Sequence, residues 1–259
     1  MVNKKEMKVI ILAGGFGSRL DEATNLIPKP LVKIGKNPII IHIMKIYLKY
    51  NIKDFYIALG YKGDKIAEFF LKKKITQNIK KKLKLGLATP FVLNNKKCRV
   101  TLIDTGLKTM TGGRVKRVGK ILKDNTFLLT YGDGVANVNL SKLINLHFVS
   151  KKMVTVTAVN PPARFGELKI KKGKVFKFSE KKSIIDSWIN GGFFVINKKF
   201  FKYIKNDQSI LEREPLEKVS KIGQLMAYKH FKFWQCMDTK RDRDKLNYLL
   251  KMNQAPWLR

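Results

Sequence analysis

Hydrophobic residues in the first half of the chain alternate between the patterns of strands and helices. Residues 8–13 form a continuous apolar run that ends in two glycines, which is typical of a strand buried in a parallel sheet. Over residues 38–50 the apolar positions recur at helical spacing, with proline in the first turn. Residues 54–59 predict a second strand, and residues 64–74 the helix that follows it.

The pattern continues to the end of the chain with shorter elements. Residues 99–104 and 126–130 predict further strands, separated by a short helix over residues 115–122. The second half predicts short strands and then helices; the strands span 154–159, 168–170, 175–178 and 192–196, and the helices 198–205, 214–222 and 241–252. These elements predict an α/β protein with a Rossmann-like mixed, mostly parallel sheet flanked by helices, and with added short strands in the C-terminal half. Because no repeat or linker interrupts them, we expect residues 1–259 to form a single domain.

The chain has a large positive charge, but this charge says little about its fold or its partners. Lysine and arginine total 54 against 19 acidic residues, a net charge of +35, while 44% hydrophobic residues exclude an intrinsically disordered protein. A charge of this size favours a polyanion partner. However, 45 of the 54 basic residues are lysines scattered along the chain, and base readout favours arginine. We therefore predict no specific nucleic-acid partner; a polyanion-binding surface stays open mainly for residues 72–84.

Cysteines and apolar runs exclude several other classes. Cys98 and Cys236 form neither a disulfide framework nor a zinc-binding spacing. The longest apolar run, residues 38–48, is too short to span a membrane. The first 17 residues have a short apolar run without the cleavage site of a signal peptide. These features predict a cytoplasmic protein with no membrane partner.

Three glycines, Gly14, Gly15 and Gly17, follow the first predicted strand, where a doubly wound sheet binds its ligands. Such a turn either only reverses the chain or presents backbone N–H groups to an anion. It matches neither a dinucleotide fingerprint, because Leu20 stands where glycine or alanine is needed, nor a P-loop, because no Lys-Ser/Thr pair follows. Lys29 lies between two prolines that fix its backbone, either as one more surface lysine or as a phosphate ligand held at a fixed point.

Together these two segments resemble the signature of the sugar-phosphate nucleotidyltransferases, which join a nucleoside triphosphate to a sugar 1-phosphate and release pyrophosphate. The resemblance implies that the glycine turn wraps the nucleotide through Leu12, Ala13, Gly14, Gly15, Phe16, Gly17, Ser18 and Arg19. It also implies that Arg19 and Lys29 are catalytic and hold the triphosphate and the leaving pyrophosphate. Ser18 stands where threonine is more usual, and keeps the hydroxyl.

Two aspartates are candidates for a metal site. Asp133 follows the strand over residues 126–130 between two glycines, and Asp238 follows an aromatic stretch near the C-terminus. Each could simply cap a turn or a helix. Mg²⁺ bound to a nucleotide needs only one or two protein carboxylates, however. The resemblance implies that Asp133 and Asp238 are the Mg²⁺ ligands and that Gly132 contacts the nucleotide.

A third segment, residues 104–114, is similar to that of the glucose-1-phosphate cytidylyltransferases. The resemblance implies that Thr109 and Arg114 contact the nucleotide; whether Arg114 would bind the base or a phosphate stays open. The resemblance extends over residues 7–257. It implies that Glu180 and Asn190 bind sugar hydroxyls, and that Lys181 is catalytic and binds the sugar phosphate. Residues 72–97 depart most from the family pattern.

The resemblance as a whole implies a cytidylyltransferase. Its substrates would be CTP and glucose 1-phosphate, its cofactor Mg²⁺ and its assembly a homo-oligomer. Residues 7–150 would mainly bind the nucleotide and residues 151–259 mainly the sugar phosphate. Two alternatives remain: a thymidylyl- or uridylyltransferase of the same fold, and a non-catalytic domain that binds polyanions through its lysines.

Overall fold

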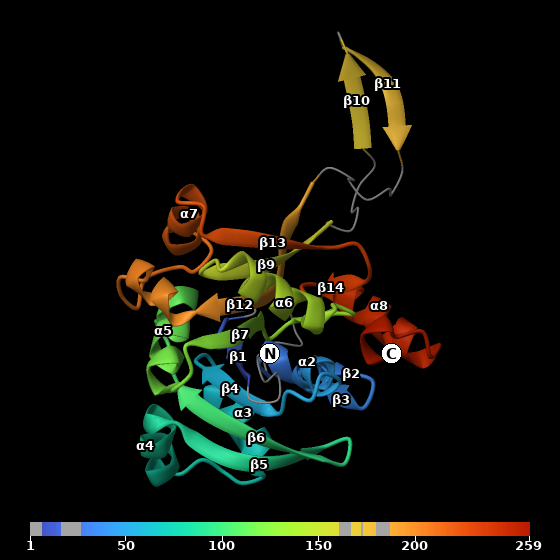
Figure 1. The fold of residues 1–259 in the computed structure, drawn as a ribbon. Coiled ribbons are helices and arrows are strands. Elements are labelled where there is room, and N and C mark those ends of the chain that lie inside the picture. Colours follow the sequence, from blue (N-terminus) through green and yellow to red (C-terminus); the bar gives the residue numbers. More distant parts are fainter. Residues whose placement is uncertain (1–6, 17–26, 161–166, 172, 180–186) are drawn as a thin grey trace.

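An eight-stranded mixed sheet runs through the computed structural model, in which residues 7–16, 27–160, 167–171, 173–179 and 187–259 are described (Figure 1). Across the sheet the strands follow the order β13 (Leu225–His230), β9 (Val154–Val159), β12 (Ile189–Asn197), β7 (Thr126–Tyr131), β1 (Lys8–Ala13), β4 (Asp54–Leu59), β6 (Lys96–Asp104) and β5 (Leu87–Leu93). Strands β7, β1, β4 and β6 are parallel neighbours, as are β13 and β9, whereas β12 and β5 pair antiparallel with their neighbours. This arrangement confirms the predicted mixed sheet.

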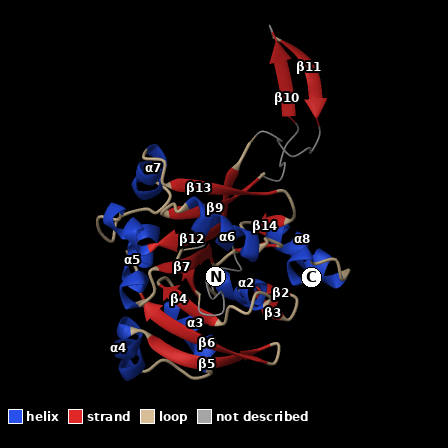
Figure 2. Cartoon of the chain, viewed as in Figure 1, coloured by secondary structure: helices blue, strands red, loops and turns tan. Residues whose placement is uncertain are grey.

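Helices cover both faces of this sheet, as Figure 2 shows. Because side chains alternate along a strand, β1 sends Val9 and Ile11 into one hydrophobic core and Ile10 and Leu12 into the other. The first core lies beneath α2 (Ile39–Leu48), α3 (Gly63–Leu71), α6 (Leu140–Ser150) and α8 (Lys240–Lys251). The second lies beneath α5 (Thr111–Ile121), the 3-10 helix η3 (Lys198–Tyr203) and α7 (Glu214–Lys221). Burial on both faces explains why β1 has no polar position between Val9 and Ala13.

Smaller elements complete the described part of the chain. They are the 3-10 helices η2 (Lys29–Leu31) and η4 (Pro256–Leu258), the helix α4 (Gln77–Leu85), and three two-stranded sheets: β2 (Lys33–Ile34) with β3 (Asn37–Pro38), β8 (Gly134–Ala136) with β14 (Trp234–Cys236), and β10 (Glu167–Lys171) with β11 (Lys174–Ser179). The β10–β11 hairpin extends away from the main sheet in Figure 1. No helix in the described part of the chain is both long and apolar enough to cross a bilayer.

Two predicted helices differ from those observed. The segment over residues 198–205 is a 3-10 helix, η3, rather than an α-helix; it begins where the Asn197 side chain accepts a hydrogen bond from the Lys199 N–H. Helix α5 begins at Thr111, four residues before the predicted start. Its first turn contains Gly112 and Gly113, and glycine is a poor helix former, so the sequence did not predict this turn. The N–H of Gly112 donates 2.9 Å to the carbonyl of Ser209, so these glycines permit a close contact with the 207–211 segment.

A buried histidine between α6 and β9 makes stability depend on pH. His147 Nδ1 lies 3.0 Å from Thr155 Oγ1, and burial lowers the pKa of His147 to about 4. In the unfolded chain its pKa is about 6.5, so below this pH the unfolded state binds the extra proton. We expect the wild type to lose about 2 to 3 kcal/mol more stability than His147→Gln between pH 7 and pH 4.5, measured by urea unfolding. Equal losses in the two proteins would contradict this expectation.

Candidate active site

A cavity of about 330 Å³ opens at the carboxyl ends of β1 and β7. Strand β1 lies between β4, the next strand of the sheet along the chain, and β7, which comes later in the sequence. The order of the strands therefore reverses at β1, and open α/β sheets bind ligands at the carboxyl ends of the strands where this reversal occurs. The residues that line the cavity are Leu12, Ala13, Gly15, Lys29, Pro30, Thr111, Tyr131, Gly132, Asp133 and Asp238. All of these residues except Tyr131 lie in segments that the sequence already singled out, namely the glycine turn, the Pro-Lys-Pro segment, residues 104–114 and the two aspartate segments.

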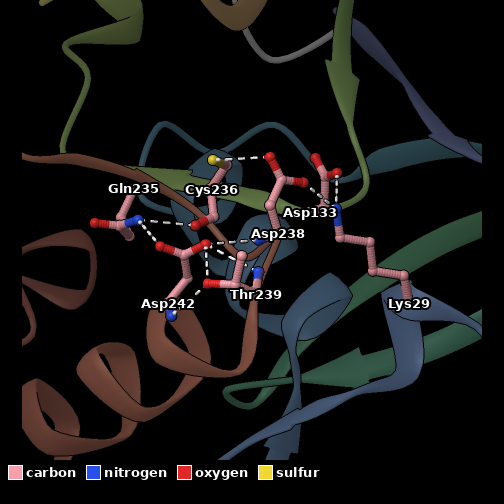
Figure 3. Close-up of polar contacts among 7 residues, drawn as sticks. All are labelled: Lys29, Asp133, Gln235, Cys236, Asp238, Thr239 and Asp242. Carbon is pink, nitrogen blue, oxygen red and sulfur yellow. Dashed lines mark hydrogen bonds and ion pairs between the residues drawn. The ribbon is translucent and has the colours of Figure 1, made fainter. Parts of the chain in front are cut away.

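Lys29 and the two candidate metal ligands meet inside this cavity (Figure 3). The Lys29 ammonium donates 2.7 Å to Asp133 Oδ2 and 2.5 Å to Asp238 Oδ1. Asp133 directly precedes β8 and Asp238 follows β14, and these two short strands pair antiparallel. The Met237 N–H also donates 2.8 Å to the Asp133 carbonyl. Pairing of β8 with β14 therefore brings together two carboxylates that are 105 positions apart in the sequence.

The loop that carries Asp238 is fixed by the start of α8. Asp242 Oδ2 accepts hydrogen bonds from the backbone N–H groups of Asp238, at 3.1 Å, and Thr239, at 2.9 Å. The Thr239 hydroxyl accepts in turn from the Asp242 N–H at 3.2 Å, which completes a capping box. Figure 3 shows these contacts directly beside Asp238. The capping box therefore orients a candidate metal ligand as well as starting the helix.

The charges of this cluster are mutually stabilised. Burial lowers the pKa of Lys29, but its contacts with Asp133 and Asp238 outweigh burial and raise this pKa above its ordinary value. Nearby, Cys236 Sγ lies 3.5 Å from Asp238 Oδ2, and burial together with the carboxylates raises the pKa of this thiol to about 12. A thiol that stays protonated is a poor nucleophile. The cluster therefore offers a fixed cation and two carboxylates rather than a nucleophile.

Arg114 is almost completely buried, with 5% of its surface exposed, and its guanidinium is bonded to protein oxygens. Nη1 donates to the Leu59 and Gly106 carbonyls at 2.8 Å and to Thr105 Oγ1 at 2.6 Å; Nη2 donates to the Gly14 carbonyl at 3.1 Å and the Leu107 carbonyl at 3.3 Å. A Cβ on Gly14 or Gly60 would come within 2.5 Å of the guanidinium, so both positions need glycine. Arg114 thus joins the glycine turn, the end of β4 and the 105–107 loop.

Comparisons with known proteins place this geometry in a family. The nucleotidyl transferase family matches residues 8–240. Glucose-1-phosphate cytidylyltransferase of Salmonella typhimurium is 45% identical over 256 residues, covering 97% of this chain and 98% of that protein. A probable glucose-1-phosphate cytidylyltransferase of Bacillus subtilis is 42% identical over 97% of this chain and 99% of its own length. The chain belongs to the glucose-1-phosphate cytidylyltransferase family of nucleotidyl transferases.

Solved structures support the fold of this nucleotidyl transferase. HddC from Yersinia pseudotuberculosis superimposes with a TM-score of 0.71 at 23% identity, covering 94% of this chain and 99% of that one. A UDP-glucose pyrophosphorylase superimposes with a TM-score of 0.68 at 14% identity, covering 95% of this chain and 99% of its own. At these identities the likeness concerns the fold alone.

The other predicted site residues of the cytidylyltransferase-family chain are not among the residues that line the cavity, or they lie outside the described residues. Thr109 is buried in the loop before α5, and Phe16 is exposed against Tyr61, with ring centroids 5.0 Å apart. Asn190 lies on β12, and its side-chain amide donates 2.9 Å to the Tyr131 hydroxyl. Gly17, Ser18, Arg19, Glu180 and Lys181 are outside the described residues.

Three residues of this nucleotidyl transferase site were missed in the sequence. Tyr131 and Thr111 line the cavity, and Glu212 accepts a hydrogen bond from each of them. Tyr131 directly precedes the Gly132-Asp133 pair, and Thr111 lies in the predicted nucleotide segment, so both were adjacent to a signal. Glu212 had no signal of its own, because its place depends on how the 207–212 loop packs against α5.

Asp133 and Asp238 fit a Mg²⁺ ion by their chemistry. Both supply the oxygen ligands that Mg²⁺ prefers, and both converge on one cationic group, the Lys29 ammonium. Within the described residues there is no group of three or more His, Cys, Asp or Glu side chains placed to hold a metal. A metal on these two carboxylates would therefore take its other ligands from phosphate oxygens and water.

Proposed function

We propose that this protein transfers a cytidylyl group from CTP to α-D-glucose 1-phosphate, giving CDP-glucose and pyrophosphate. The observation that carries this proposal is the cavity in which Lys29 meets Asp133 and Asp238, in a chain 45% identical over nearly its whole length to a glucose-1-phosphate cytidylyltransferase. A cation and two candidate metal ligands in one cavity supply what a reaction between two phosphorylated substrates requires.

The proposed reaction is an in-line attack on phosphorus. A phosphate oxygen of glucose 1-phosphate forms a bond to the α-phosphorus of CTP, and the bond from that phosphorus to the bridging oxygen of pyrophosphate breaks. No general base is needed, because the attacking phosphate is already ionised near neutral pH. Catalysis then consists of positioning the two substrates and neutralising their charge.

Each charged group has a proposed role in this step. The Lys29 ammonium, held protonated in the cavity, binds the triphosphate and the departing pyrophosphate. Asp133 and Asp238 would hold Mg²⁺, which supplies charge neutralisation of the phosphate oxygens when bound. We assign Arg19 to the same triphosphate and Lys181 to the sugar phosphate. Residues 7–150 would mainly bind the nucleotide and residues 151–259 mainly the sugar phosphate, although Asp238 of the second half reaches the cavity of the first.

A nucleotide panel tests this assignment. Purified protein is incubated with Mg²⁺, glucose 1-phosphate and one of CTP, UTP, dTTP, ATP or GTP, and pyrophosphate release is measured. We expect kcat/KM for CTP to exceed that for each other nucleotide by roughly 100-fold or more, since a site that hydrogen-bonds one base leaves polar groups unpaired with another. A preference for UTP or dTTP would replace the cytidylyl assignment by its alternative. Absence of release with all five would refute the reaction class.

A further inference from the structure

Four polar side chains form a continuous hydrogen-bonded chain beside the cavity. The Asn190 amide donates to the Tyr131 hydroxyl at 2.9 Å, and this hydroxyl donates to Glu212 Oε1 at 2.5 Å. The Thr111 hydroxyl donates to Glu212 Oε2 at 2.7 Å and accepts from the Leu211 N–H at 2.9 Å. We call Asn190, Tyr131, Glu212 and Thr111 the hydroxyl chain. It links β7 and β12 of the sheet to the start of α5.

Glu212 stands out in a chain with a net charge of +35, because its carboxylate is held by two neutral hydroxyls. No lysine or arginine among the described residues forms an ion pair with it. Glu214, two residues further on, behaves in the opposite way and forms salt bridges of 2.8 Å to both Lys205 and Lys218. Within the described part of the chain, the partners of the Glu212 carboxylate are thus hydroxyl groups.

Tyr131 holds its hydroxyl at a fixed position in this chain. Its ring packs edge-on against Phe194, with centroids 6.0 Å apart and planes at 89°. Gly192 also lies against the ring; its φ is +79°, and a Cβ there would come within 2.6 Å of the Tyr131 ring. The Gly192 N–H also donates 2.8 Å to Asn190 Oδ1 and so orients the amide that binds the tyrosine.

The hydrogen-bonding groups that the hydroxyl chain leaves unused match those of an alcohol. Each carboxylate oxygen of Glu212 accepts one hydrogen bond here and has a second lone pair, and the Asn190 amide has a second N–H. Alcohols both donate and accept, so they can satisfy both kinds of group. A carboxylate repels phosphate, whereas the Lys29 ammonium attracts it. Glu212 therefore favours uncharged hydroxyl groups, and the phosphates of the reaction are bound elsewhere in the site.

We infer that Tyr131 and Glu212, together with Asn190, read the ring hydroxyls of the sugar substrate and determine which sugar 1-phosphate is used. This inference rests on the proposed function for the identity of the sugar. Glu212 accepts from a ring hydroxyl, and Tyr131 holds Glu212 and Asn190 in place. Tyr131 and Thr111, two members of the hydroxyl chain, line the cavity, so the chain borders the space that the substrates would enter.

A double-mutant cycle between enzyme and substrate tests this inference. Wild type, Glu212→Gln and Tyr131→Phe are assayed with glucose 1-phosphate and with its 2-, 3-, 4- and 6-deoxy analogues, and Glu214→Gln serves as the matched control. We expect both site variants to raise KM for glucose 1-phosphate by roughly 10- to 100-fold, with KM for CTP changed less than about 2-fold. For at least one deoxy analogue the penalty seen in the wild type should shrink by about 10-fold in Glu212→Gln, since the hydroxyl it lacks has lost its acceptor.

Other results would overturn the inference. Equal changes in KM for both substrates, an effect of Glu214→Gln as large as that of Glu212→Gln, or deoxy penalties unchanged in every variant would each exclude a role in reading the sugar. Melting temperatures of the variants within about 3 °C of the wild type exclude misfolding as the cause. If the wild type does not use glucose 1-phosphate, the proposed function fails by itself. The same cycle is then run with the sugar 1-phosphate that the chain does use.

Discussion

Replacing Asp133 by asparagine is expected to lower kcat by at least about 100-fold, because the variant loses one of the two carboxylates that converge in the cavity. Asparagine keeps the size and the oxygen of the side chain but removes its charge. The fold should persist, since Lys29 retains its 2.5 Å contact with Asp238. The measurement is steady-state pyrophosphate release over a Mg²⁺ titration, with circular dichroism to check the fold. If charge is what Asp133 supplies, more Mg²⁺ will restore only part of the rate.

Asp124→Asn is the matched control for this prediction. Asp124 also forms a 2.5 Å salt bridge to a lysine, Lys8, and its side chain is 32% exposed against 31% for Asp133. It precedes β7 at the other end from the cavity, so removing its charge leaves the site unchanged. We expect its kcat to stay within about 2-fold of the wild type, because exposed ion pairs contribute little. An Asp133→Asn variant as active as this control would refute the role of Asp133.

The sequence predicted the centre of the fold well because each central element carries its own signal. Strands β4 and β9 have their predicted bounds, and β1 is a continuous apolar run because it is buried on both faces. Helices α4 and α6 and strands β5 and β13 were not predicted; in α4 only Leu83 is buried, and lysines occupy four of the other eight positions. Strand β5 is at the edge of the sheet and pairs antiparallel with β6, so it does not show the continuous apolar pattern of a central strand.

In the site, too, short motifs could be predicted from the sequence, whereas contacts between distant segments could not. The glycine turn, the Pro-Lys-Pro segment and the two aspartates could be found because each is a short motif. That Lys29 contacts both aspartates could not be found, because it depends on the pairing of β8 with β14. Glu212 shows the limit most clearly: one acid in an exposed loop becomes part of a site only through two hydroxyls from β7 and α5.

The sequence predicts that Arg114 contacts the nucleotide. In the structure its guanidinium already donates hydrogen bonds to five protein oxygens. Burial lowers its pKa, but an arginine side chain stays charged in proteins. We therefore expect Arg114 to act on the nucleotide through the glycine turn that it holds, by way of the Gly14 carbonyl. A side chain with fewer donors in this place leaves buried carbonyls unpaired, and each of these costs about 1 to 3 kcal/mol.

Arg114→Lys is accordingly expected to destabilise the protein by about 2 to 4 kcal/mol and to lower its melting temperature by roughly 5 to 15 °C. Arg117→Lys is the control, because Arg117 lies one turn further along α5 and forms an exposed two-point ion pair with Asp207, at 2.9 and 2.6 Å. Its change should stay within about 1 kcal/mol. Urea unfolding of both variants measures the difference, and kcat/KM for CTP should fall only in Arg114→Lys. If Arg114→Lys is as stable as the control but uses CTP poorly, Arg114 contacts the nucleotide directly and the carbonyl contacts are secondary.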